Sequence, residues 1–279
     1  MRYGPPMYFK FKAWLKSNLS NYLEKLLQAK KFINLFQNSE YLMSHDKFSS
    51  TACLILASHE TLQSSMVDVA IHSKSQFSQD LFALAATEFK KNGYFVEFGA
   101  TDGKEMSNTY LLEKRYSWNG ILAEPARIWH SRLSLNRKVN LETSAVDAET
   151  GKIVDFAEDK SAMLSGLIQS SYAGTSRAAL YQVPTISLDD LLTKYSAPKH
   201  IDYLSIDTEG SELQILENFS FSHHSFSVIT VEHNKRSDSY RIKDILERHG
   251  YYRVHQNLCE IEYWFVSEQI FDKFFAVEK

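Results

Sequence analysis

Acidic residues recur where apolar, strand-like segments end. Glu97 lies inside the run YFVEF, which leads into the turn Gly99-Ala100-Thr101-Asp102-Gly103. A carboxylate removed from water needs hydrogen-bond donors or a cation, because an unpaired buried charge costs far more than packing gains. The segment therefore predicts either a ligand site or a turn whose own amides satisfy Glu97. Further acids follow later apolar segments, at Glu124, Asp147, Asp207, Glu209 and Glu232.

Glu124 ends the second strand-like segment, where nucleotide-binding sheets hold a ribose. A carboxylate at that position accepts hydrogen bonds from ribose hydroxyls. The turn from Gly99 to Gly103 lets a ligand approach the backbone, but it lacks the G-x-G-x-x-G spacing that admits a pyrophosphate. Asp102 would also repel a pyrophosphate. An acidic turn instead suits a ligand with a ribose and a cationic amine, and S-adenosylmethionine has both.

If the ligand is S-adenosylmethionine, three residues after later strands could activate a nucleophile that takes up its methyl group. Asp207 and Glu209 lie in the segment IDTEG, and His233 lies in VEHN. Transfer from a sulfonium is an in-line displacement, and a protonated hydroxyl is a poor nucleophile, so a base would help. An alternative is that Asp207, Glu232 and Asn234 hold a divalent ion, since oxygen ligands suit magnesium. We favour the base without a metal.

From Tyr94 onward, strand patterns alternate with helix patterns. This alternation predicts a mostly parallel sheet covered by helices on both faces. The last two strands are separated by few residues, so we expect them to pair antiparallel. Strands are expected at 94–98, 120–124, 140–147, 151–159, 201–207, 226–234, 251–256 and 260–266. Helices are expected at 110–115, 126–138, 187–195, 211–219 and 239–250.

Residues 158–182 interrupt the alternation, being rich in Ser, Gly and Ala with weak periodicity. A loop of that length in a compact domain is usually functional or disordered. We expect it to form a lid over the acceptor site, and a surface insertion is the alternative.

Residues 8–38 have apolar side chains at helical spacing and predict one or two amphipathic helices. Six lysines against the single acid Glu24 would suit an anionic membrane surface. We favour the alternative of a helical cap that packs on the catalytic domain or on a second copy of the chain, as a homo-oligomer. With a second helical stretch at 48–70, the prediction is a helical extension at 1–70 and a catalytic domain at 71–279.

Composition limits the function classes. The chain has 279 residues, 44% of them apolar, which suffices for a full core, and its net charge of -3 argues against bulk binding to nucleic acid. Two cysteines, Cys53 and Cys259, predict no disulfide framework and favour a reducing compartment. No apolar run approaches the roughly 18 residues of a membrane span, and no secretory signal is evident. We therefore expect a cytoplasmic protein, and association with a membrane surface through its basic first helix stays open as an alternative.

The segment FVEFGATDGKEMSNTYLLEKRYSWNGILAEP resembles the FkbM-type methyltransferases, as do KSQFSQDLFAL, SLDDLL and IDYLSIDTEGSELQILENF. The resemblance runs from about Ser75 to Val266. It implies an S-adenosylmethionine-dependent enzyme with a Rossmann-like α/β fold, in which only the last of seven strands is antiparallel. It also implies transfer to a hydroxyl, often on a sugar of a surface polysaccharide or on a secondary metabolite.

The resemblance also assigns roles by position. Glu97 and the turn from Gly99 to Gly103 would hold the methionine part, Glu124 and Pro125 the ribose, and Asp147 the adenine amino group. Asp207 and Glu209 would face the departing methyl. Two alternatives stay open at this point: a nicotinamide-dependent oxidoreductase on the same fold, and an S-adenosylmethionine-binding module without turnover.

Overall fold

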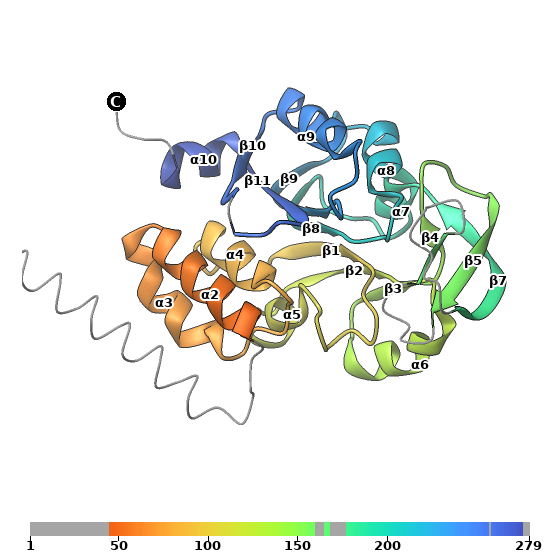
Figure 1. Ribbon diagram of the computed structural model, residues 1–279, viewed down its shortest axis with the longest axis horizontal. Helices are drawn as coiled ribbons and strands as arrows, with labels where there is room; N and C mark the ends of the chain where they lie inside the picture. The colour runs from red at the N-terminus through yellow and green to blue at the C-terminus, as the bar shows by residue number, and fades with distance from the viewer. Residues whose placement is uncertain (1–44, 160–164, 168–176, 257, 276–279) are drawn as a thin grey trace, which may run out of the picture.

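A seven-stranded sheet forms the centre of the protein, in a computed structural model that describes residues 45–159, 165–167, 177–256 and 258–275. Its strands are β1 (Tyr94–Phe98), β2 (Asn119–Ala123), β3 (Asn140–Glu142), β8 (His200–Ile206), β9 (Ser225–Glu232), β10 (Tyr251–Val254) and β11 (Glu262–Ser267). They lie in the order β10-β11-β9-β8-β1-β2-β3 (Figure 1).

The topology confirms the predicted Rossmann-like arrangement. Only β11 runs antiparallel to its neighbours, and the other pairs are parallel. The chain progresses outward from β1 to β3 on one side and from β8 onward on the other. The strand order therefore reverses between β1 and β8, which is where open α/β sheets bind ligands.

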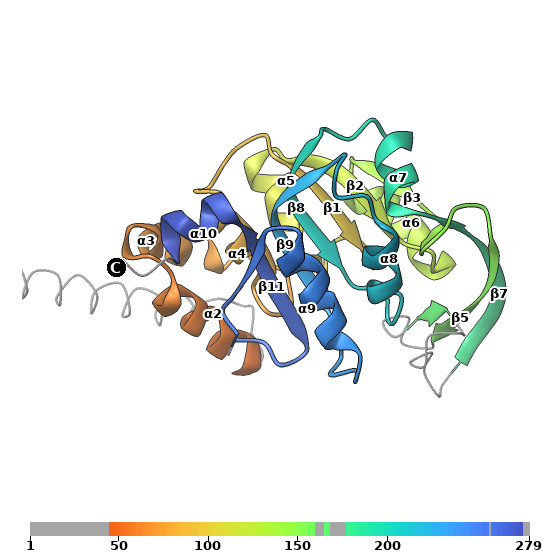
Figure 2. The same ribbon diagram turned by 90° about the horizontal axis from the view of Figure 1, so that it is seen from above.

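Helices cover both faces of the sheet (Figures 1 and 2). Alternate residues of β1 divide between two apolar cores, with Phe95 in one cluster and Val96 in the other. The core with Phe95 contains side chains of α2 (His45–Ala57), α3 (Glu60–Ala70), α4 (Gln79–Ala86), α5 (Tyr110–Tyr116) and α6 (Arg127–Asn136). The core with Val96 contains side chains of α7 (Leu188–Lys194), α8 (Glu212–Asn218) and α9 (Ser239–Arg248). The last helix is α10 (Glu268–Phe274).

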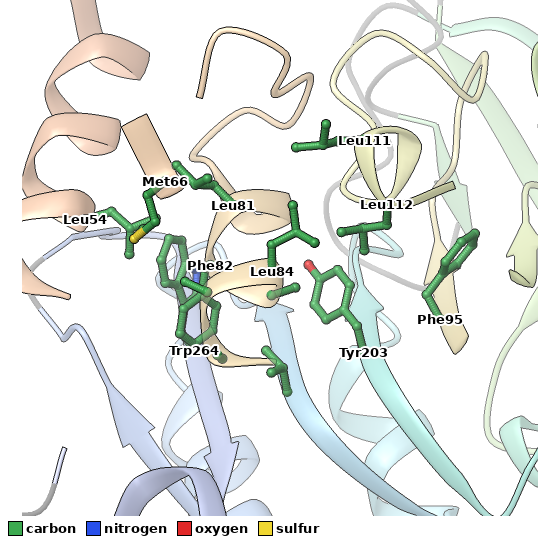
Figure 3. Close-up of a cluster of buried hydrophobic side chains, with 14 of the residues drawn as sticks. Leu54, Met66, Leu81, Phe82, Leu84, Phe95, Leu111, Leu112, Tyr203 and Trp264 are labelled. Carbon is green, nitrogen blue, oxygen red and sulfur yellow. The ribbon is translucent and has the colours of Figure 1, made fainter. Parts of the chain in front are cut away.

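The helices before residue 70 belong to the apolar core on one face of the main sheet. Leu54 of α2 and Met66 of α3 are fully buried in the cluster that contains Phe82 and Trp264 (Figure 3). The rings of Phe82 and Trp264 stack with centroids 4.8 Å apart. Packing therefore continues across the boundary predicted at residue 70, and that division stays a prediction.

The predicted helical stretch at 48–70 is two helices, α2 and α3, because the chain turns at Ser58 and His59. The amphipathic helix predicted at 8–38 lies outside the described residues. No helix in the described part of the chain combines the length and the apolar character needed to cross a membrane.

A second sheet of four strands follows β3. Its strands are β4 (Ala145–Val146), β5 (Ile153–Asp159), β6 (Gly166–Leu167) and β7 (Arg177–Ile186), in the order β4-β7-β5-β6. It lies beyond the β3 edge of the main sheet, at the right of Figure 1. The strand predicted at 151–159 is confirmed as β5.

Two predictions in this region are wrong. Residues 140–147 do not form one strand, because Oε1 of Glu142 accepts the N–H groups of Thr143 and Ser144, each at 2.9 Å, and the chain then crosses to the second sheet. Residues 158–182 are not one long loop, since β5, β6 and β7 take up part of them. The rest of the predicted lid, 160–164 and 168–176, lies outside the described residues.

Candidate active site

A cavity of about 610 Å³ opens where the strand order reverses, within the roughly 300–1,000 Å³ typical of small-molecule sites. It lies at the carboxyl ends of β1, β2, β8 and β9, the edge at which the predicted acids converge. The predicted residues that line it are Gly99, Thr101, Asp102, Glu124, Pro125, Asp207, Glu209, Glu232 and Asn234.

Gly99 brings the turns after β1 and β8 together. Its φ is 73°, and a Cβ atom added to it would lie 2.2 Å from the carbonyl oxygen of Asp207. No residue with a side chain fits there without moving backbone. Position 99 therefore requires glycine, because the turn after β8 comes so close. Asp207 lies beside the turn from Gly99 to Gly103 as a result.

Glu124 is 4% exposed, and both of its oxygens are anchored. Oε2 accepts the N–H of Thr101 at 2.7 Å, and Oε1 accepts the N–H of Ala126 at 2.8 Å. Burial raises the pKa of Glu124 to about 7, although these two amides work against the rise. Each carboxylate oxygen has two acceptor sites, so each retains one for a ligand hydroxyl.

The second sheet gives the cavity an apolar end. Ala126, which follows Glu124 by two residues, belongs to the apolar cluster of this sheet. Apolar side chains from α6, β4, β5 and β6 meet there on the cavity wall, namely Trp129, Ala145, Val146, Phe156 and Leu167. This surface, which we call the apolar end, suits the flat face of a purine.

The opposite end of the cavity is acidic. Asp207, Glu209 and Glu232 each offer a carboxylate oxygen, and these oxygens lie within 4.8 Å of one another. Burial and the charges of Glu232 and Glu209 raise the pKa of Asp207 well above its usual range. Burial and the charge of Glu212 raise the pKa of Glu209 to about 7, and burial with the charge of Glu209 raises that of Glu232 to about 8. We call these three residues the acidic end.

No lysine or arginine within the described ranges forms an ion pair with the acidic end. Three carboxylate oxygens at this separation suit a hard divalent cation. The predicted metal set named Asn234 in place of Glu209. In the structure Nδ2 of Asn234 donates to Oε2 of Glu232 at 2.7 Å, so Asn234 orients that carboxylate.

His233 does not reach the cavity wall. Adjacent residues of a strand face opposite sides, and Glu232 takes the side that faces the cavity. The ring of His233 packs on that of Tyr263 with centroids 4.0 Å apart, and its Nδ1 accepts the N–H of Lys235 at 3.1 Å. Burial and the charge of Arg253 lower its pKa to about 4. This geometry argues against the predicted role of His233 as the base.

Glu97 also lies behind the wall, and its carboxylate is occupied by the chain itself. It accepts hydrogen bonds from the backbone N–H of Asn108 at 2.7 Å and from the hydroxyls of Ser107 and Thr109. Burial raises its pKa, and Arg137, at 3.7 Å, works against the rise. Glu97 therefore orders the loop before α5, and its predicted contact with the methionine part is not supported.

Three further predicted residues lie off the wall. Ala100 is buried, and a Cβ atom on Gly103 would meet Leu133 at 2.5 Å, so both serve packing of the turn. Asp147 follows β4, and its Oδ1 is buried without a hydrogen-bond partner among the described residues. The predicted contact of Asp147 with adenine stays a prediction without support from the cavity's shape.

The sequence analysis missed Glu262, which lies on the cavity wall and is 7% exposed. In the pairing of β11 with β9, Glu262 lies directly opposite Glu232. Oε1 accepts from Nε2 of Gln79 at 2.7 Å and Oε2 from Nε1 of Trp264 at 2.8 Å, and no cation pairs with it within the structure's described ranges. The signal was present, since an acid within the apolar run IEYWF poses the same question as Glu97 in YFVEF.

A family model for the FkbM methyltransferase domain matches residues 97–252, which is more than half of the chain. The chain belongs to the FkbM methyltransferase domain family. This membership favours methyl transfer over the oxidoreductase alternative, in agreement with the altered glycine spacing. The matched range contains most of the residues that line the cavity, but not Glu262.

Similarities to solved structures are weak. A precorrin-6y C5,15-methyltransferase from Geobacter metallireducens GS-15 is 9% identical with a TM-score of 0.38, and the alignment covers 67% of this chain and 85% of that one. An uncharacterized protein from Burkholderia thailandensis is 10% identical with a TM-score of 0.25, over 98% and 77% of the two chains. No curated protein matches the chain. The assignment therefore depends on the family model and on the site.

Proposed function

We propose that the protein is an S-adenosylmethionine-dependent O-methyltransferase that acts on a hydroxyl group, of a sugar in a surface glycan or of a secondary metabolite. One observation carries this proposal: a single cavity joins an apolar end, the anchored carboxylate of Glu124, and an acidic end with which no Lys or Arg of the described residues forms an ion pair.

The charge of the cavity wall supports a cationic cofactor. S-Adenosylmethionine supplies an activated methyl group on a positively charged sulfur and carries an ammonium as well. Such charges are stabilised by carboxylates in a site of low dielectric constant, whereas a pyrophosphate would be repelled. Among the described residues, Arg132 is the one Lys or Arg on the wall, against the acids Asp102, Glu105, Glu124, Asp207, Glu209, Glu232 and Glu262.

The chain's residues would divide the work along the cavity. Trp129 and Phe156 would pack on the adenine, and the free acceptor sites of Glu124 would take the ribose hydroxyls. Bound S-adenosylmethionine would supply the methyl group, and its sulfur would take the electron pair of the broken bond, while Asp207 would accept the proton that the acceptor hydroxyl loses. Burial and the charges of Glu232 and Glu209 raise the pKa of Asp207, which makes its ionised carboxylate a stronger proton acceptor.

Binding measurements on the purified chain test the cofactor. Calorimetry should detect S-adenosylhomocysteine and no NAD, and Glu124→Ala should weaken S-adenosylhomocysteine by roughly 30-fold or more, because hydrogen bonds to charged groups contribute about 1.5–3 kcal/mol each. Glu247→Ala, on the exposed face of α9, is the control and should bind normally. Unchanged affinity in a folded Glu124→Ala protein would refute the ribose assignment.

An acceptor screen tests turnover. Labelled methyl donor should transfer its label to a hydroxylated glycan or metabolite in the presence of the wild-type protein. Cofactor binding without transfer to any of a broad set of acceptors would favour the alternative of a non-catalytic binding module.

A further inference from the structure

Asn108, in the loop before α5, is a buried residue of the cavity wall with one unsatisfied atom. It is 8% exposed and lines the cavity, and its Oδ1 accepts no hydrogen bond in the described structure. Buried polar atoms nearly always have a partner, because leaving one unpaired costs free energy. An acceptor of this kind at a ligand cavity indicates a donor supplied by the ligand.

Two hydrogen bonds fix the orientation of Asn108. Its backbone N–H donates to Oε1 of Glu97 at 2.7 Å, and its Nδ2 donates to Oγ of Ser205 at 2.9 Å. Glu97 of β1 and Ser205 of β8 are partners in the sheet register, so Asn108 bridges the two strands between which the strand order reverses. Nδ2 has one of its two hydrogens engaged in this way, whereas Oδ1 has no partner among the described residues, so the oxygen is the atom that a ligand donor would satisfy.

The surroundings select the kind of donor. An amide oxygen accepts from any N–H or O–H group, but Asn108 shares its cavity with the acidic end, and Ser205 precedes Asp207 by two residues. Negative surroundings favour a donor that also carries positive charge. An ammonium meets both requirements, and S-adenosylmethionine has one on its amino-acid portion.

We propose that Oδ1 of Asn108 accepts a hydrogen bond from the α-ammonium of S-adenosylmethionine and so selects ligands that carry the amino-acid portion. The inference rests on the proposed cofactor. It places the methionine contact on Asn108, whereas the sequence predicted Glu97. Glu97 contributes by holding the backbone of Asn108 in place.

Two probes isolate this contact. S-Adenosylhomocysteine and 5′-methylthioadenosine share the adenosine and the thioether sulfur, but only the first has the amino-acid portion. Asn108→Leu keeps a similar size and removes the amide. It should weaken S-adenosylhomocysteine roughly 10- to 100-fold, the range for a hydrogen bond to a charged group, and leave 5′-methylthioadenosine within about twofold.

Two further variants make the test specific. Asn108→Asp keeps an acceptor and should bind S-adenosylhomocysteine within about threefold of the wild type, whereas a contact through Nδ2 to a ligand carboxylate would make it bind far more weakly. Trp129→Ala, at the apolar end, should weaken both probes equally. If Asn108→Leu does not fold, as judged by circular dichroism, Asn108→Ala replaces it in the same comparison.

The outcomes separate this inference from the proposed function. Equal weakening of both probes by Asn108→Leu, no weakening of either, or an Asn108→Asp protein as weak as Asn108→Leu would each overturn the contact while leaving the cofactor assignment intact. Failure of the wild type to bind either probe would overturn the proposed function and the contact with it.

Discussion

Two groups of buried and half-buried carboxylates lie in opposite electrostatic surroundings. Glu97 and Glu113 both flank Arg137, whose side chain is fully buried. Arg137 donates to Glu113 and to the hydroxyl of Thr109, and it lies 3.7 Å from Glu97. The charges in this group compensate one another, and the pKa of Glu113 is lowered overall by Arg137 and other donors in spite of burial.

The acidic end has no such compensation. Burial, the charges of neighbouring acids and a hydrogen bond to Glu232 all raise the pKa of Asp207. Glu232 also faces Glu262 across the sheet, where like charges destabilise a strand pair. The contrast separates acids that hold the fold together from acids that a ligand, a proton or a cation must satisfy.

Asp207→Asn should have the largest effect on the reaction. The variant keeps the shape of the side chain but cannot take up the acceptor's proton, so turnover with an acceptor from the screen should fall roughly 10²–10⁴-fold, the usual contribution of a general base. The affinity for S-adenosylhomocysteine should change much less, as measured by calorimetry. Equal losses in both would move Asp207 to the cofactor contacts.

Arg137→Met should have the largest effect on stability. Glu97 would be left buried without its cation and, among the described residues, Glu113 would keep only Lys114, and breaking a buried ion pair typically costs about 3–5 kcal/mol. Denaturant unfolding measures the loss. Arg241→Met is a matched control, because the Arg241–Glu217 pair is exposed and surface pairs contribute about 0–1 kcal/mol. Similar losses in the two variants would show that Arg137 is not the compensating charge.

The stability of the ligand-free protein should fall as the pH rises from about 6.5 to about 8. The pKa values of Glu124 and Glu209 are raised to about 7 and that of Glu232 to about 8, so these carboxyls keep more protons in the folded state than in the unfolded state. Below about 6.5 the histidines whose pKa is lowered to about 4, such as His233, oppose this trend, because they bind fewer protons in the folded state. The free energy of unfolding decreases with rising pH wherever the unfolded state binds fewer protons than the folded state. Thermal unfolding between pH 5 and pH 9 measures the slope.

Glu232→Gln sharpens that measurement, because it removes one like charge from the acidic end. The variant should show a shallower decline above pH 7 and a higher melting temperature than the wild type at pH 8.5. A magnesium-dependent rise in melting temperature for the wild type alone would indicate that the acidic end also binds a cation. A wild-type stability that is constant or increases over this window would contradict the uncompensated charges.

The sequence by itself determined the order of the elements and most of the acids that meet at the cavity. Strand and helix periodicity is local, and the carboxyl ends of parallel strands meet at one edge whatever the loops between them do. Glu124 and Asp207 could therefore be placed from chain order alone. The antiparallel pairing of the last two strands followed in the same way from the short connection between them.

Only the tertiary structure decided which acids are compensated. Arg137 is 40 positions from Glu97 in the sequence, and it reaches that carboxylate because α6 folds back beside the glycine turn. Glu262 joins the site because β11 enters the sheet next to β9. The second sheet built the apolar end from segments that looked like two strands and a loop. Charge compensation acts through distance in space, and separation along the chain does not fix that distance.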